Sequence, residues 1–522
     1  MPEIILAAIN AKWIHPSLAL RLLKSNLKDL ELSCEILEFA LRQPLKEKTD
    51  PILMAKPKLL ALSVSIWNHK ATIELLKTLE EEWTNEKQNN IQKPIVVLGG
   101  PEVSWLNEES EIFLHADFVI RGEGENSFRS LCNMIFFGDG NPDLSLTERT
   151  FNEKKVTFIN HGDTVVDADK IASPYDLYTD EDLGRKLVYV EASRGCPFSC
   201  EFCQAPIGRQ APIGRKGQAR VEGPVREFPL ENFLSEMEKL IERGGRRFKF
   251  LDRTFNLDTG RAEKIIRFFL EKIIYPEHRG ALAGKPLCVH FEMVPSRFPP
   301  GLRELLSGFP PGTLRLELGI QTFNPETLVN ISRAGDILSA GRQIEEAIET
   351  LEFLRRKTNA IIHADLIAGL PGEDLASFRS GFDRLMCVLT GHEEAGDLKT
   401  APGSSFEIQL GILKCLPGTA ISRHNKTHGM KYMDEPPYEV TETKALPAAE
   451  LNSIKNFAHF WETIVNRNSF PGLIGNFILP GEPVFDKFMV LSNRLLGHFG
   501  RNWGIDRRDL EFFLREFIDS PF

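Results

Sequence analysis

The stretch Ser193-Arg-Gly-Cys-Pro-Phe-Ser-Cys-Glu-Phe-Cys203 decides how the rest of the sequence is interpreted. It places Cys196, Cys200 and Cys203 in a C-x3-C-x2-C pattern, in a 522-residue chain that holds only 8 cysteines. Three thiolates at this spacing on one loop can hold a cubane iron–sulfur cluster; such clusters commonly take four cysteines, so one iron is left open. Zinc is the competing metal, but it prefers four protein ligands, and no histidine lies nearby in the sequence.

The cysteines follow directly on a predicted strand at Leu187–Ala192. Amphipathic helices separate most of the five strands predicted after it, which are Phe248–Leu251, Cys288–Met293, Leu314–Gly319, Ile361–Ile367 and Phe406–Leu413. Six β/α units are fewer than the eight of a closed barrel, so residues 185–425 are predicted to form a partial (β/α)6 barrel. The cysteine motif then lies at the carboxyl end of the first strand, where barrel active sites are found.

The first 140 residues alternate short apolar runs with helical patterns. The predicted strands are Glu3–Ile9, Ser33–Phe39, Leu59–Ser65, Ile95–Leu98 and Asp117–Ile120. This alternation is typical of an α/β domain with a doubly wound, Rossmann-like parallel sheet. Ligands of such sheets bind outside the carboxyl ends of the strands. Unusual residues stand at these ends, namely Asn10 to His15, Trp67-Asn68, Gly99-Gly-Pro-Glu102 and Gly122-Glu-Gly-Glu125.

The remaining segments show weaker patterns. Residues 141–184 are predicted to be a linker with a short hairpin around Lys155–Val166, and residues 426–522 a mostly helical, phenylalanine-rich domain. Its phenylalanines indicate either a packed core or an aromatic substrate pocket. A near-tandem A-P-I-G-R at Ala205–Arg215, followed by further basic residues, indicates a solvated loop, with phosphate or RNA contact as the alternative.

The composition is that of a globular chain. The formal net charge is −10, which argues against a protein built around a nucleic-acid backbone, although a local basic patch stays compatible with it. No apolar run approaches the roughly 18 residues of a membrane span. The short run Ile4–Ile9 follows Glu3 and is expected to be a buried strand rather than a signal peptide. A cytoplasmic protein without a membrane span is therefore expected.

The S-R-G-C-P-F-S-C-E-F-C stretch resembles the signature of radical S-adenosylmethionine enzymes, whose fold is a partial six-unit barrel. The resemblance implies that a [4Fe-4S] cluster on the three cysteines binds S-adenosylmethionine through its open iron. A reductant such as flavodoxin or ferredoxin would supply the electron that cleaves it to methionine and a 5′-deoxyadenosyl radical. By the same resemblance the S-adenosylmethionine contacts are Phe202 and Leu370 at the adenine, Asp252 at the methionyl amine, Glu317 and Gln321 at the ribose, and Arg333 at the carboxylate. The second strand departs from the family pattern, because Leu251-Asp252-Arg253 replaces a common Gly-Gly-Glu.

A doubly wound domain ahead of such a barrel has two familiar identities. The cluster-bearing domain of methylthiotransferases needs three cysteines, and this region has only Cys34 and Cys132. The other identity is a cobalamin-binding domain, and the loop residues resemble it; a generic nucleotide site is the alternative for the glycines alone. The cobalamin contacts that the resemblance implies are Asn10, His15, Ser65, Trp67, Asn68, Gly99, Gly100, Pro101, Glu102, Gly122, Glu123, Gly124 and Glu125.

The D-x-H-x-x-G pattern that supplies a histidine to cobalt in many cobalamin domains is absent. The resemblance therefore implies cobalamin bound without such a histidine, with Ser65, Trp67 and Asn68 near the lower face of the corrin. His15 or His69 could still ligate cobalt, the alternative being an exposed or capping role. Cys415 could face the barrel mouth or be a buried thiol, and no cysteine follows it, so a C-terminal auxiliary cluster is not expected.

Together these resemblances imply a cobalamin-dependent radical enzyme with a C-terminal domain of uncharacterised role, and most simply a methyltransferase. Cobalt(I) would take a methyl group from one S-adenosylmethionine, and a second molecule would yield the radical that abstracts hydrogen from an unactivated carbon. Two alternatives stay open: a radical cyclisation or rearrangement with cobalamin in electron transfer, and a non-catalytic corrinoid-binding regulator. The sequence selects no substrate and assigns no general acid or base.

Overall fold

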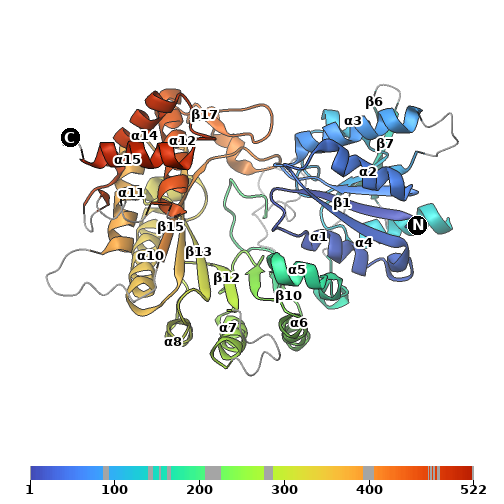
Figure 1. Cartoon of the computed structure of the whole chain (residues 1–522), viewed down its shortest axis with the longest axis horizontal. Helices are drawn as coiled ribbons and strands as arrows, with labels where there is room; N and C mark the ends of the chain where they lie inside the picture. Colours follow the sequence, from blue (N-terminus) through green and yellow to red (C-terminus); the bar gives the residue numbers. More distant parts are fainter. Residues whose placement is uncertain are drawn as a thin grey trace. The chain divides into compact units, whose positions relative to one another are not determined.

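The structure is a computed structural model that describes residues 2–85, 93–138, 145–151, 154–160, 166–205, 225–275, 286–391, 405–467, 469–470, 473, 477–478 and 482–519 (Figure 1). The chain divides into two compact units. Unit one comprises Met1–Arg194, Ile207–Lys249 and Glu435–Pro437, and unit two comprises Gly195–Pro206, Phe250–Asp434 and Tyr438–Phe522. The A-P-I-G-R repeat, from Pro206 onward, lies outside the described residues.

Unit one is built on a seven-stranded sheet in the order β2-β1-β3-β4-β5-β7-β6. Its strands are β1 (Ile4–Asn10), β2 (Cys34–Ala40), β3 (Leu59–Ser63), β4 (Ile95–Gly99), β5 (Phe118–Arg121), β6 (Ser145–Phe151) and β7 (Lys154–Asn160). Every neighbouring pair is parallel except the hairpin β6–β7. The five strands predicted before residue 140 are confirmed. The hairpin expected around Lys155–Val166 is misplaced: the hairpin of the structure is formed by β6 and β7, which turn before Lys154, and it extends this sheet.

The strands β1, β3 and β4 are buried on both faces, which explains their continuous apolar runs. Along β1, Ile5, Ala7 and Ile9 belong to one hydrophobic cluster. The alternate residues, Ile4, Leu6 and Ala8, belong to a second cluster. The helices drawn around this sheet in Figure 1 are α1 (Leu18–Ser25), α2 (Leu45–Ala55), α3 (His69–Asn85) and α4 (Glu125–Phe137). Unit one also contains α5 (Asp180–Arg185) and α6 (Leu230–Glu242).

Six strands occupy the positions predicted for the barrel. Unit one holds β8 (Val188–Val190) and β11 (Arg247–Phe250), the latter ending at the boundary between the units, together with the short antiparallel pair β9 (Ser193–Arg194) and β10 (Arg226–Glu227). Unit two holds β12 (Cys288–Met293), β13 (Leu314–Gln321), β14 (Ile361–Ala368) and β15 (Ser405–Ile412). These four strands are consecutive and parallel.

The strands β12, β13 and β14 alternate strictly between buried and half-buried residues. The buried members are apolar, as Val289, Leu316 and Ile362 illustrate. The half-buried members include His290, Arg315, Glu317, His363 and Asp365, so one face of this sheet is polar. The helices between and after the strands are α7 (Thr259–Ile274), α8 (Pro300–Ser307), α9 (Pro325–Asn330), α10 (Ile337–Lys357) and α11 (Leu375–Thr390).

The C-terminal region is mostly helical, as predicted. It contains the small antiparallel pair β16 (Lys431–Tyr432) and β17 (Val440–Glu442), then α12 (Ala448–Trp461), a π-helix (Glu462–Asn466), α14 (Phe485–Phe499) and α15 (Arg507–Asp519). The rings of Phe457, Trp461, Phe485 and Phe488 contact one another, and the centroids of contacting rings lie 4.8–5.8 Å apart. These four side chains are at most 1% exposed, so they are core residues of this region.

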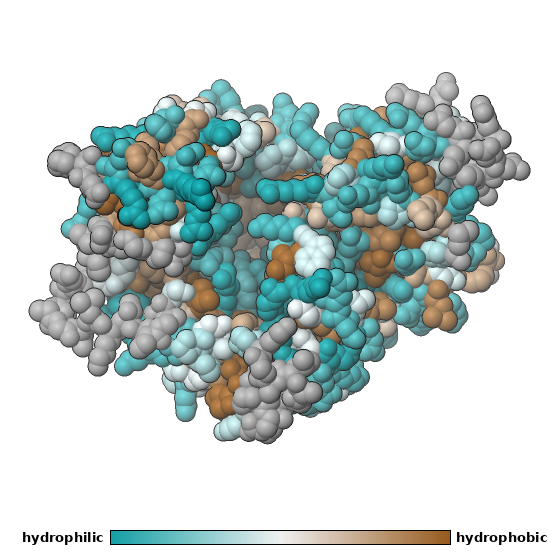
Figure 2. All heavy atoms as spheres, viewed as in Figure 1, coloured by the Kyte–Doolittle hydropathy of each residue, from teal (hydrophilic) through white to brown (hydrophobic). Residues whose placement is uncertain are grey.

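In the described ranges, none of the helices combines the length and the apolar character that crossing a membrane requires. On the face drawn in Figure 2, hydrophilic residues are interleaved with scattered hydrophobic ones.

Candidate functional site

The three motif cysteines line a cavity of about 250 Å³ in unit two. The loop that carries them forms one wall, and residues at the carboxyl ends of β12 and β13 and on α10 form the others. All three thiols are half-buried and free of disulfides. Burial raises the pKa of the Cys203 thiol, while the N–H of Ala205 and the charge of Arg253 act in the opposite direction. Three thiols on one wall of a cavity are the donor set that a cluster with one open iron requires.

Half of the residues predicted to contact S-adenosylmethionine line this cavity. Phe202, Gln321 and Arg333 do so, whereas Asp252, Glu317 and Leu370 are not among its lining residues. Asp252 is 2% and Leu370 0% exposed. Glu317 lies further down β13, close to His290. The six contacts remain predictions, and the cavity geometry supports the first three most directly.

Arg333 stands between the cysteine loop and β13. Its Nη1 lies 3.9 Å from Cys200 Sγ, and its Nη2 donates to the carbonyl of Gly319. A Cβ at Gly319 would lie 2.5 Å from Gln321 Nε2, so the glycine leaves the room that the Gln321 side chain occupies. Gln321 itself has a φ of 71°, in the left-handed region, where β13 ends. The absent side chain and the strained turn together shape the wall opposite the cysteines.

Glu201, inside the motif, was missed by sequence reasoning. Its side chain is completely buried and accepts from His424 Nε2 at 3.0 Å, from Arg423 Nη2 and from Ser332 Oγ. Its backbone N–H donates to Ile331 at 3.1 Å, and its carbonyl accepts from Ile421 at 3.0 Å. These bonds tie the cysteine loop to two distant segments of unit two. The available signal was an acidic residue between two predicted cluster ligands.

Two polar residues that line the cavity were also not predicted. Arg253 follows the second barrel strand and its Nη1 lies 3.7 Å from a carboxylate oxygen of Glu292, at the end of β12. Their position in the sequence could have indicated them as site residues, because both stand at the carboxyl ends of predicted strands.

In unit one, the residues predicted to contact cobalamin gather at one edge of the sheet. Ser63 of β3 is in register with Ala8 of β1 and with Gly99 of β4, so the loops after these strands leave the sheet together. A Cβ at Gly100, whose φ is 107°, would lie 2.6 Å from the carbonyl oxygen of Val64. Only glycine fits this close approach of two strand-end loops.

Several of the residues predicted to contact cobalamin form hydrogen bonds within and between these loops. Asn68 donates to the carbonyls of Ile9 and Ser63, both at 3.0 Å, and accepts from Ser65 N–H. His69 Nδ1 lies 3.2 Å from Glu102 Oε1, and both side chains are buried. Trp67, by contrast, is 51% exposed and free to meet a ligand.

The two candidates at the end of β1 are also held by neighbours. Asn10 donates to Glu38 at 3.2 Å, and His15 Nδ1 lies 2.8 Å from the hydroxyl of Tyr189. Burial, with the charges of Lys12 and Lys249, lowers the pKa of His15. A neutral imidazole is the form that can ligate a metal, so His15 keeps its place among the predicted contacts.

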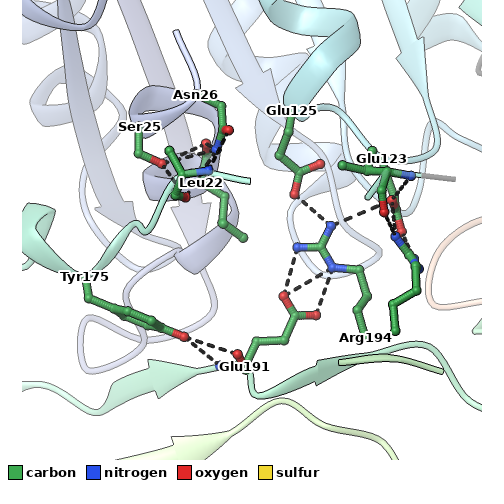
Figure 3. A network of polar contacts seen from close by, with 11 residues as sticks. Leu22, Ser25, Asn26, Glu123, Glu125, Tyr175, Glu191 and Arg194 are labelled. Carbon is green, nitrogen blue, oxygen red and sulfur yellow. Dashed lines mark hydrogen bonds and ion pairs between the residues drawn. The ribbon is translucent and has the colours of Figure 1, made fainter. Parts of the chain in front are cut away.

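The acidic residues of Gly122-Glu-Gly-Glu125 form a network with two arginines (Figure 3). Arg194 contacts Glu125 at 2.7 Å and Glu191 at 2.8 Å, and its Nη1 lies 3.8 Å from Glu123. Glu123 also forms an ion pair with Arg226. Burial would raise the pKa of Glu123, but the hydrogen bond from Arg226 and both guanidinium charges outweigh it, so this pKa is lowered. The carboxylates therefore anchor Arg194, which immediately precedes the cysteine loop in the sequence.

Comparison with protein families finds three matches along the chain. Residues 4–132 match the B12 binding domain, and residues 190–385 match the radical SAM superfamily, where SAM is S-adenosylmethionine. Residues 426–510 match a family described only as a protein of unknown function, DUF4080. These matched regions follow one another along the chain in the order B12 binding domain, radical SAM superfamily and DUF4080.

Two curated relatives illustrate the sequence similarity. An uncharacterized methyltransferase of Pyrococcus horikoshii is 30% identical over 182 residues, which is 34% of this chain and 37% of that protein. The cobalamin-dependent radical SAM methyltransferase TokK of Streptomyces tokunonensis is 28% identical over 203 residues, 35% of this chain and 27% of that protein. The chain thus spans well under half the length of these relatives.

Two solved structures share the fold. The cobalamin-dependent S-adenosylmethionine radical enzyme OxsB, with aqua-cobalamin bound, has a TM-score of 0.61 at 14% identity, covering 99% of this chain and 75% of its own. The radical S-adenosylmethionine methyltransferase TsrM from Kitasatospora setae has a TM-score of 0.57 at 16% identity, covering 83% and 79%. The predicted fold class is therefore confirmed. The chain therefore carries a B12 binding domain, a radical S-adenosylmethionine domain and a C-terminal region that matches a family of unknown function.

Proposed function

We propose that this protein is a cobalamin-dependent radical S-adenosylmethionine methyltransferase. The observation that carries the proposal is the cavity of unit two, where the three motif thiols stand together with Arg333 and Gln321, in a chain that also matches the B12 binding domain. Similarity to the methyltransferases named above supports methyl transfer as the reaction.

The residues of the chain have separable tasks in this reaction. Cys196, Cys200 and Cys203 would hold the cluster, and Glu201 keeps their loop in place through its bonds to Ser332, Arg423 and His424. When bound, the cluster with S-adenosylmethionine supplies a 5′-deoxyadenosyl radical, and cobalamin supplies the methyl carrier.

Arg333 places a guanidinium beside the thiols, where it can pair with a carboxylate. The apolar wall, which includes Phe202, Met293 and Ile344, excludes water from the radical step.

The reductant and the substrate belong to the proposal as well. A flavodoxin- or ferredoxin-type reductant and a cytoplasmic location stay predictions. The substrate is proposed only as a molecule with an unactivated carbon.

The test uses anaerobically purified chain loaded with iron, sulfide and cobalamin, and incubated with dithionite, S-adenosylmethionine carrying a deuterated methyl group, and a small-molecule extract. The proposal predicts 5′-deoxyadenosine, S-adenosylhomocysteine and a product that has gained the deuterated methyl group. Formation of 5′-deoxyadenosine with a rearranged but unlabelled product would instead establish the cyclisation alternative. Absence of all three would favour a corrinoid-binding regulator.

Matched cysteine variants separate the cluster from general thiol effects. Cys200→Ala is expected to abolish 5′-deoxyadenosine formation, because it removes a cluster ligand. Cys415→Ala, at a half-buried cysteine that does not line the cavity, is expected to retain it. Equal activity of the two variants would refute the cluster assignment.

A further inference from the structure

A second group of ligand atoms lies on the polar face of the sheet in unit two. His290 on β12, Glu317 on β13 and His363 on β14 each offer one ligand atom, and these atoms all lie within 4.8 Å of one another. All three residues are half-buried. His290 Nε2 and Glu317 Oε2 are 3.1 Å apart.

Strand register explains why these residues meet. Glu317 and His363 are direct partners across β13 and β14, and His290 is the partner of Arg315 across β12 and β13. All of them occupy half-buried positions, so they point to the same face.

The group lies one layer below the cavity that the cysteines line. His290 precedes Glu292 by two residues, and Glu317 precedes Gly319 by two, and both Glu292 and Gly319 line that cavity. At about 3.3 Å per residue, the group lies about 7 Å down the strands from that cavity.

A fourth side chain orients one of the histidines. His363 Nε2 lies 2.5 Å from Glu407 Oε2 on β15, and Glu407 is in turn held by Arg315 through contacts of 2.9 and 3.2 Å. The other ring nitrogen, Nδ1, is buried and has no hydrogen-bond partner among the described residues. Histidines that bind metals usually donate their second nitrogen to a carboxylate in this way, which fixes the ring and its tautomer.

We propose that His290, Glu317 and His363 bind a divalent first-row transition-metal ion, and that Glu407 positions His363 for it. Two imidazoles and one carboxylate are the ligand set of catalytic zinc sites and of non-haem iron sites. Three protein ligands leave at least one coordination position for water or for an oxygen donor such as a carboxylate of the substrate. The site is separate from the thiols, so the inference does not rest on the proposed methyl transfer.

The charges of the group suit a dication. Glu317, Glu407 and Glu292, the register partner of Glu317, carry three carboxylates. Two guanidiniums face them: Arg315 contacts Glu407, and Arg253 lies 3.7 Å from Glu292 and also interacts with Glu317, so the carboxylates exceed the guanidiniums by one. In the absence of an ion the same side chains would pair with one another, so binding measurements on variants decide between the two arrangements.

The experiment titrates Mn²⁺ into the full chain that already holds oxidised cluster and cob(III)alamin, both silent in electron paramagnetic resonance. The proposal predicts loss of the free Mn²⁺ signal up to one equivalent per chain, and its return when Zn²⁺, which binds such ligands more tightly, is added. His290→Gln, Glu317→Gln and His363→Gln are each expected to weaken Mn²⁺ binding at least about 10-fold.

Glu407→Gln tests the positioning role, with an expected loss of about 10-fold to 100-fold in affinity for Mn²⁺. His498→Gln, at an exposed histidine of α14, is the matched control and is expected to bind as the unaltered chain does. Circular dichroism and cluster absorbance identify any variant that fails to fold, and because all four substitutions are tested singly, one such failure leaves the others informative. Absence of Mn²⁺ and Zn²⁺ binding by the unaltered chain, or equal binding by the folded variants, would overturn the proposal.

Discussion

Replacement of Glu373 by glutamine is predicted to change how the stability of this protein depends on pH. Glu373 ends the Gly369-Leu-Pro-Gly-Glu373 turn after β14 and is only 2% exposed. Its Oε1 accepts from the hydroxyls of Thr322 and Ser377, while Oε2 is buried without a hydrogen-bond partner among the described residues. Burial raises the pKa of this carboxyl from its ordinary 4.5 to about 7, although both hydroxyls act to lower it.

The sign of the effect follows from proton binding. Between pH 4.5 and about 7 the folded chain keeps the proton that the unfolded chain has lost, so the free energy of unfolding falls as pH rises through this window. At 1.36 kcal/mol per pKa unit, the fall amounts to about 3 kcal/mol. Glutamine keeps an oxygen that can accept from the Thr322 hydroxyl, and it does not titrate. The substitution therefore removes this fall in the free energy of unfolding. Its buried NH2 lacks a partner and costs about 1 kcal/mol or more, so we expect Glu373→Gln to be about 1–2 kcal/mol more stable than the unaltered chain at pH 8.

Urea unfolding, followed by circular dichroism between pH 5 and pH 8.5, measures the effect. Glu346→Gln, at an exposed glutamate of α10, is the matched control and should keep the pH profile of the unaltered chain. Parallel profiles for Glu373→Gln and the unaltered chain would refute the reasoning, because they would mean that Glu373 titrates alike in the folded and unfolded states.

Three further predictions concern contacts described above. Glu201→Gln, which removes a buried carboxylate from Arg423 and His424, should lower the free energy of unfolding by about 3 kcal/mol and reduce the iron retained per chain on anaerobic purification; unchanged iron content would contradict its role in holding the cysteine loop. Arg194→Ala should destabilise unit one by about 3 kcal/mol, since it leaves the carboxylates of Glu191 and Glu125 without their guanidinium, and Arg194→Lys should recover part of this in the same urea titration. Gly100→Ala should cost about 2–3 kcal/mol in thermal or urea unfolding, because its Cβ would meet Val64 O at 2.6 Å. Gly138→Ala, where φ is also positive but nothing lies within 4 Å, should cost about 1 kcal/mol, and equal losses at the two glycines would show that the contact with Val64 is not the cause.

Much of the fold could be predicted because its signals are local. The strands β1 and β3 are apolar on both faces, and the helices between them have amphipathic patterns, so element type and order follow from short windows of sequence. The cysteine motif could be predicted for the same reason, since its three ligands lie on one loop. Phe202, Gln321 and Arg333 were placed by family resemblance, and the cavity brings these three together.

The rest depends on strand register and on contacts between distant segments. Glu317 was expected at the ribose. Its place beside His290, which is 27 residues before it, and His363, which is 46 residues after it, follows from the pairing of three strands. Glu201 meets His424 across 223 positions, and no local pattern joins them. A hairpin was predicted around Lys155–Val166, whereas the structure forms it from β6 and β7, and only the structure shows β7 pairing with β5.

The bonds of Glu201 also bear on how the parts of this protein can be exchanged. The segment whose side chains pair with Glu201 ends at His424, and the region matched to the family of unknown function begins at residue 426. Any chimera that replaces this C-terminal region is therefore joined within two residues of the support of the cysteine loop. A junction upstream of Ile421 would replace the residues that contact Glu201 together with the C-terminal region. A junction downstream of His424 would keep those residues unchanged. The choice of junction thus sets whether a swapped C-terminal region also changes the contacts that hold the cysteine loop.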